Sequence, residues 1–141
     1  MLAENEKLKV TNAIKEAEKN TSGEIRVHIE NHCKGNILDR ASEVFAILNM
    51  HKTALRNGVL FYIALKDKKF AILGDAGINH KVPSNFWDAI KEQMQILLKE
   101  GKTADALASG IAQAGVALKS HFPYETDDIN ELSDEISFQD N

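Results

Sequence analysis

Three oxygen-bearing side chains, Glu24, Asp75 and Asn79, are the residues of this sequence best suited to metal-assisted chemistry. Carboxylate and amide oxygens are the ligands that Ca²⁺ and Mg²⁺ prefer, and a metal held by them could polarise a phosphoryl group. A structural interpretation competes with this one. Asp75 follows a glycine at a turn, where aspartate is common for its turn chemistry alone, and Glu24 could lie on a solvated strand face.

Arg56 is the candidate for binding an anion, because its planar guanidinium matches phosphate or carboxylate. If the protein is an enzyme, we predict Asp75 and Arg56 as its catalytic residues. The alternative is that Arg56 simply pairs with Asp75 or Glu24. Thr21 and Ser22 offer hydroxyl groups nearby, but the sequence places no general base to activate either one.

The remaining reactive residues do not match a known kind of site. Arg40 lies one residue further from Cys33 than the arginine of a cysteine-phosphatase loop, and it falls inside a predicted helix. His28, His32 and Cys33 lack the spacing of zinc ligands, so we interpret the histidines as surface residues. No phosphate-binding Gly-Lys-Ser or Gly-Lys-Thr loop and no dinucleotide glycine fingerprint is present, and we therefore predict no nucleotide cofactor.

Hydrophobic periodicity predicts the elements that must position these residues. Apolar side chains recur at helical spacing over about residues 3–19, 38–51, 84–99 and 103–122. Strict alternation over residues 24–30 predicts a strand with one wet or functional face. Two apolar runs, 59–65 and 70–73, are separated by a polar turn and predict a hairpin.

The order α-β-α-β-β-α-α predicts a three-layer α/β/α Rossmann-like sandwich around a small mixed sheet. A right-handed crossover makes the first two strands parallel, and the hairpin makes the third antiparallel to the second. The run 59–65 is apolar on both faces, as expected of a central strand. In this topology segments 21–24, 56–58 and 74–79 converge at one edge of the sheet.

The sequence around this edge is similar to a known family. Residues 21–27, 57–61 and 69–78 resemble the TPM-domain family of thylakoid-lumen phosphatase-like proteins and their bacterial relatives, and the resemblance covers about residues 5–122. It implies the same α/β/α sandwich, and it implies more remotely an acid-phosphatase-like activity or divalent-cation binding. Many relatives have an export signal and a membrane anchor, which we do not find in this sequence. Fold analogy alone does not transfer an activity.

Charge separates the chain into two parts. Its 141 residues fit one domain, and the net charge is −4. Seven acidic residues and no basic one lie after residue 123, which leaves a charge of +3 on the rest. We predict a TPM-like domain over residues 1–123 and a flexible acidic tail over 124–141. The alternative is that Ile129, Leu132 and Ile136 form an amphipathic motif that docks on the body or on a partner.

Composition also limits the location of the protein. The single cysteine, Cys33, cannot form an intramolecular disulfide, as is typical of a reducing compartment. The first residues are acidic rather than signal-like, and the longest apolar run, 58–65, is too short to span a bilayer. We predict a cytoplasmic protein with no membrane-spanning segment, although peripheral association stays open. No basic stripe predicts nucleic-acid binding.

Two functions are compatible with these observations. The first is a noncatalytic protein-interaction or cation-binding module, with the acidic tail as its contact with a protein partner and with Ca²⁺ or Mg²⁺ as the cation. The alternative is a metal-assisted, acid-phosphatase-like phosphomonoester hydrolase. The sequence shows neither a nucleophile with its base nor a dedicated phosphate loop, and this favours the binding module.

Overall fold

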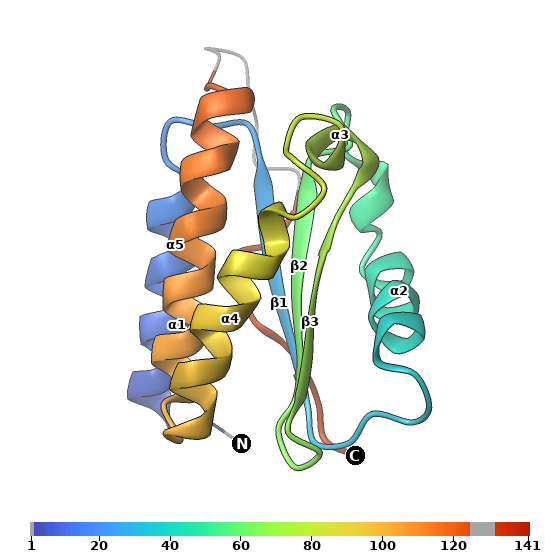
Figure 1. Cartoon of the computed structure of the whole chain (residues 1–141), viewed down its shortest axis with the longest axis vertical. Helices are drawn as coiled ribbons and strands as arrows, with labels where there is room; N and C mark the ends of the chain where they lie inside the picture. Colours follow the sequence, from blue (N-terminus) through green and yellow to red (C-terminus); the bar gives the residue numbers. More distant parts are fainter. Residues whose placement is uncertain (1, 125–131) are drawn as a thin grey trace.

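The computed structural model describes residues 2–124 and 132–141, which form a mixed α/β sandwich (Figure 1). Its elements, in chain order, are α1 (Glu4–Glu18), β1 (Glu24–Glu30), α2 (Ile37–Ile47), the 3₁₀ turn η1 (Met50–Lys52), β2 (Gly58–Ala64), β3 (Lys69–Gly74), α3 (Ala76–Asn79), α4 (Phe86–Lys99), α5 (Thr103–His121) and β4 (Ser137–Gln139). The α/β class and the predicted order of the main elements are confirmed.

The sheet has the strand order β3-β2-β1-β4. β1 and β2 are parallel and β2 and β3 are antiparallel, as the crossover and hairpin arguments predicted. β2 is buried at every residue, consistent with its continuous apolar run. β4 is parallel to β1 and pairs only with the last three residues of that strand.

Helices cover both faces of the sheet and enclose two apolar clusters (Figure 1). The larger cluster lies between the sheet and helices α1, α4 and α5, and it contains Ile25, Val27 and Ile29 of β1. The smaller one lies under α2 and η1 and contains Leu60 and Tyr62 of β2. The odd-numbered residues of β1 therefore face the three-helix side, and its even-numbered residues face α2.

Small residues let helix α5 pack closely on its neighbours. A Cβ atom added at Gly115 would lie 2.7 Å from the Cβ of Ala17 on α1. One added at Gly110 would lie 2.6 Å from the sulfur of Met94 and 2.9 Å from the ring of Phe61. Carbon atoms are not in favourable contact below about 3.5 Å. The small residues of α5 thus serve helix packing as well as packing on the sheet.

The structure differs from the sequence prediction in three places. The predicted tail contributes β4, so residues 137–139 belong to the sheet. Leu132 and Ile136 pack against the apolar clusters of the body, as in the alternative of a docking motif, and Ile129 lies outside the described residues. The predicted turn after β3 contains the short helix α3, and the next helix begins at Phe86 and not at residue 84. The second face of β1, expected to be wet, is buried at Glu24, His28 and Glu30 and half-buried at Arg26.

Candidate functional site

Three loops meet at the edge of the sheet where β1 and β2 begin and β3 ends, as predicted. The amide of Asp75 donates to the carbonyl of Gly58 at 2.9 Å, and that of Gly77 donates to the carbonyl of Arg56 at 2.8 Å. The amide of Glu24 donates to the carbonyl of Asn57 at 3.4 Å. The convergence therefore rests on main-chain hydrogen bonds.

Arg56 and Asp75 form a two-pronged ion pair at this edge. Arg56 Nε donates to Asp75 Oδ2 at 2.7 Å and Arg56 Nη2 donates to Oδ1 at 2.8 Å. The same Oδ1 accepts the amide of Ala76 at 2.7 Å and caps α3. Hydrogen bonding to Asp75 raises the pKa of Arg56. The two predicted catalytic residues are thus brought together, in the pairing that we gave as the structural alternative.

The amide of Asn79 is also held by the scaffold. Its Nδ2 donates to the carbonyl of Gly74 at 2.7 Å, and its Oδ1 accepts from Trp87 Nε1 at 3.0 Å. Glu24 lies on β1, and β2 separates that strand from Asp75 at the end of β3. Two strand spacings of about 4.8 Å thus separate the main chains that carry Glu24 and Asp75. Glu24 and Asp75 therefore do not lie on adjacent strands.

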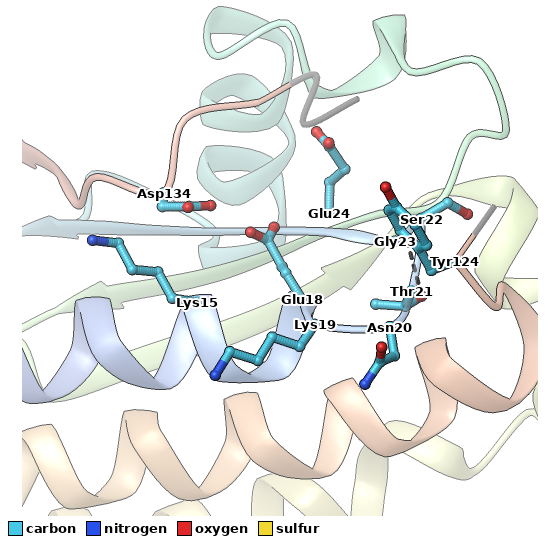
Figure 2. A pocket seen from close by; sticks show the side chains of 10 residues that line it. All are labelled: Lys15, Glu18, Lys19, Asn20, Thr21, Ser22, Gly23, Glu24, Tyr124 and Asp134. Atoms are coloured by element: carbon cyan, nitrogen blue, oxygen red, sulfur yellow. Dashed lines mark hydrogen bonds between the residues drawn. The ribbon is translucent and has the colours of Figure 1, made fainter. Parts of the chain in front are cut away.

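A hollow of about 270 Å³ lies on the other side of Glu24, between the end of α1 and the returning tail. Figure 2 shows the carboxylate of Glu18 rising from α1 toward β1, close to Asp134. The residues that line the hollow are Lys15, Glu18, Lys19, Asn20, Thr21, Ser22, Gly23, Glu24, Tyr124 and Asp134. Acidic and basic groups therefore share a small, open concavity.

Glu18 is an acid of this hollow with a strongly raised pKa. Its Oε2 accepts the amide of Ile25 at 2.8 Å. Burial, followed by the hydrogen bond and charge of Asp134 and the charge of Glu24, raises the pKa of Glu18 to about 9. Glu18 therefore keeps its proton at neutral pH, and that proton can bridge to Asp134. In residues 2–124 and 132–141, no three acidic, histidine or cysteine side chains are grouped as a metal-ligand set.

A second polar cluster is centred on Glu30, whose side chain is fully buried on the α2 side of β1. Arg40 donates to Glu30 through Nε at 2.9 Å and through Nη2 at 2.8 Å, and the hydroxyl of Tyr62 donates to the same carboxylate. His28 Nε2 lies 2.8 Å from Glu30 Oε1. Burial alone would raise the pKa of Glu30, but these hydrogen bonds outweigh it and lower the pKa to about 2.

This cluster corrects the interpretation of His28 as a surface residue. Its side chain is buried between Glu30 and Ser137, and burial lowers its pKa. His32 does lie at the surface, where its Nδ1 is 2.9 Å from Asp67 Oδ1. The sequence signal for the buried cluster is the alternation of β1, which predicts a wet or functional face but does not show which residues cover it.

Residues 132–141, the returning tail, contact both the hollow beside Glu18 and the polar cluster around Glu30. Ser137 Oγ lies 2.9 Å from His28 Nδ1, and Gln139 Oε1 accepts from Arg40 Nη2 at 3.2 Å. Asp134 lies beside Glu18 in the hollow (Figure 2). Residues 132–141 thus follow the length of β1, from its start to its end.

The chain belongs to the TPM domain family, which matches residues 1–117. It is also similar to the BA42 protein of the psychrophilic bacterium Bizionia argentinensis, whose NMR structure has 46% sequence identity. That alignment covers 99% of this chain and 96% of BA42, with a TM-score of 0.91. The family resemblance predicted from the three converging segments is therefore confirmed.

More distant solved structures share the fold. The N-terminal domain of the cg2496 protein from Corynebacterium glutamicum has 11% identity, covers 93% of this chain and 82% of its own, and has a TM-score of 0.68. An N-terminal domain from P. gingivalis has 14% identity and a TM-score of 0.71, and the alignment covers 88% of this chain and 82% of that domain. No curated protein matches the sequence. Among the described helices, none is long and apolar enough to cross a membrane.

Proposed function

We propose that this TPM domain is a noncatalytic module that binds a partner protein. The observation that carries the proposal is the ion pair between Arg56 and Asp75, in which both carboxylate oxygens and two guanidinium nitrogens are already used. A phosphomonoester bound at this edge would have to compete with Asp75 for Arg56. The arrangement supports a structural role for the pair, because it links the loop before β2 to the end of β3.

The charge of the hollow supports the same proposal. Burial, followed by the hydrogen bond and charge of Asp134 and the charge of Glu24, raises the pKa of Glu18 to about 9. With Glu18 protonated, the carboxylates of Glu24 and Asp134 balance the ammonium groups of Lys15 and Lys19, so the hollow has no excess positive charge to bind a phosphate dianion. A binding role is compatible with this hollow, whereas the phosphatase hypothesis finds no support there.

Hydrolysis of p-nitrophenyl phosphate tests the proposal directly. The full chain is assayed with Mg²⁺ or Ca²⁺ across acid and neutral pH, together with Asp75→Asn and with Asp88→Asn as a control at an exposed helix position. We expect no turnover above the protein-free rate in any sample. Turnover by the wild-type chain that is lost only in Asp75→Asn would refute the proposal and establish the hydrolase alternative.

Cation binding is a second candidate, favoured by the proton that Glu18 retains next to Asp134. A Ca²⁺ or Mg²⁺ ion could displace that proton and bind the carboxylates of Glu18 and Asp134. An NMR titration of the full chain with each metal distinguishes the possible positions. Amide shifts at residues 18, 24–25 and 134 that saturate, and that Glu18→Gln removes, would place the ion in the hollow. Shifts at residues 24 and 74–79, with none at 18 and 134, would place it at Glu24, Asp75 and Asn79, as the sequence predicted.

A further inference from the structure

The side of β1 that faces away from β2 is an edge where another extended chain could pair. The family match ends at residue 117, before β4, so the part of the chain it covers has β1 as an edge strand. An edge strand presents main-chain N–H and C=O groups that readily pair with another extended segment. In this chain that edge is covered by residues 132–141, which come from outside the matched region.

The covering segment is bound through side chains on alternate faces, as an added strand would be. Ile136 packs against the apolar cluster on the three-helix side, and the ring of Phe138 lies 5.0 Å from Lys7 Nζ. Ser137 and Gln139 point to the other face, where they meet His28 and Arg40.

Both ends of the segment have their own contacts. Leu132 packs against the apolar cluster under α2. At the other end, Asn141 Oδ1 accepts the amides of Asn31 and His32, both at 2.9 Å, and Asn141 Nδ2 donates to the carbonyl of His32 at 2.8 Å. Asp140 Oδ1 accepts from Asn31 Nδ2 at 3.0 Å. These contacts fix the register of the segment on β1 and favour particular side chains at both of its ends.

Charge identifies the kind of segment that fits. Arg26 is the cation that faces the acidic part of the segment: its Nη2 donates to the carbonyl of Glu135 at 3.3 Å, and the charges of Glu135 and Asp134 both act on it. Lys7 lies over the ring of Phe138, and Arg40, which donates to Gln139, is also paired with Glu30 and Glu43. At Arg26 the edge of β1 is therefore complementary to an acidic extended chain.

We propose that the edge of β1 is a binding site for an extended acidic segment of a partner protein, added parallel to β1, and that residues 132–141 occupy this site in cis. This inference rests on the proposed binding role and names the class of its partner. The partner segment carries an aliphatic residue in the place of Ile136 and a hydrogen-bonding side chain in the place of Gln139. A tethered segment has an effective concentration in the millimolar range, so the tail excludes weaker ligands.

Fluorescence anisotropy with the full chain tests the site. The probe is a fluorescein-labelled peptide with the sequence of residues 132–141. The variant Ile136→Asp removes the apolar anchor of the cis segment, and Ile96→Asp makes the same substitution at an exposed isoleucine of α4 as a control. We expect Ile136→Asp to bind the peptide with saturation, at least tenfold more tightly than the wild-type chain and Ile96→Asp. A peptide that itself carries I136D should bind at least tenfold more weakly.

Several outcomes overturn the inference. One is a folded Ile136→Asp chain, with native circular dichroism, that does not bind the peptide. Another is equal binding by the wild-type chain, which would place the peptide elsewhere. A concentration-dependent dimer of the wild-type chain that Ile136→Asp dissociates would assign the edge to a second copy instead of a separate partner.

A second variant decides the question if Ile136→Asp does not fold. Ser137→Ala combined with Gln139→Ala removes only the polar contacts with His28 and Arg40, and we expect at least threefold tighter peptide binding than by the wild-type chain. No gain in binding by this folded variant would overturn the site. The phosphomonoester assay has a separate readout, so loss of this inference would leave the noncatalytic role standing.

Discussion

Replacing Glu18 by glutamine should stabilise the protein at neutral pH, because glutamine resembles the protonated acid and does not ionise. Glu18 has a pKa of about 9 in the folded protein against an ordinary value of 4.5. The folded state therefore holds a proton that the unfolded state releases. The contribution of Glu18 to stability is fully present below pH 4.5, declines as the pH rises, and is lost above about 9.

The size of this effect follows from the same values. Each unit between the two pKa values corresponds to about 1.4 kcal/mol, so the limit at pH 7 is about 3 kcal/mol. Glu18 is partly exposed, and solvent screening reduces this limit to about 1 kcal/mol. In Glu18→Gln the side-chain carbonyl can still accept the amide of Ile25, and the amide group can donate to Asp134.

Urea unfolding of the full chain between pH 4 and pH 9 measures the effect. We expect equal free energies of unfolding for the wild-type chain and Glu18→Gln near pH 4, and a gap in favour of the variant that reaches about 1 kcal/mol at pH 7 and widens toward pH 9. Glu16→Gln is the matched control, because Glu16 is exposed on the same helix and its pKa is lowered by Lys19. Parallel pH profiles of the wild-type chain and Glu18→Gln would refute the reasoning.

Other perturbations test the rest of the structure. Arg40→Gln leaves the buried Glu30 carboxylate without its cation and should cost about 3 kcal/mol in urea unfolding; a loss below 1 kcal/mol would contradict a buried ion pair. Because the pKa of Glu30 is lowered to about 2, the wild-type chain should lose stability as the pH falls from 4.5 toward 2, and this part of the acid transition should be absent in Glu30→Gln, monitored by circular dichroism. Gly77→Ala would place a Cβ atom 2.1 Å from the carbonyl oxygen of Leu55 and should cost at least about 2 kcal/mol, which a near-native thermal midpoint would disprove. Gly115→Val should separate α1 from α5 at Ala17 and cost about 2 kcal/mol or more, whereas unchanged unfolding would mean that the two helices are not in close contact.

The sequence was sufficient to predict the central part of the fold. The alternation over residues 24–30 and the unbroken apolar run of β2 have the periods of a strand and of a doubly covered strand, and the short polar turn after β2 requires a hairpin. Handedness then leaves one arrangement for β1 and β2. The convergence of three loops followed from this topology without any knowledge of side-chain contacts.

What the sequence could not supply depends on contacts between distant residues. β4 has only three residues and lies in an acidic segment, so its pattern did not differ from that of a solvated end. The polar face of β1 could be wet or functional on the sequence alone, because the partners of Glu30, namely Arg40 and Tyr62, come from other elements. Glu18 is an ordinary acid on a helix until Asp134 returns beside it, and only the folded chain brings the two together.

The pairing of β4 with β1 connects the beginning of the protein with its end. His28 and Ser137 are 109 positions apart, so this edge of the sheet closes only after β4 has been synthesised. During synthesis at about 5–20 residues per second, β1 would pass several seconds with its outer edge open. During that interval the main-chain groups of the outer edge are open to pairing with any other extended segment.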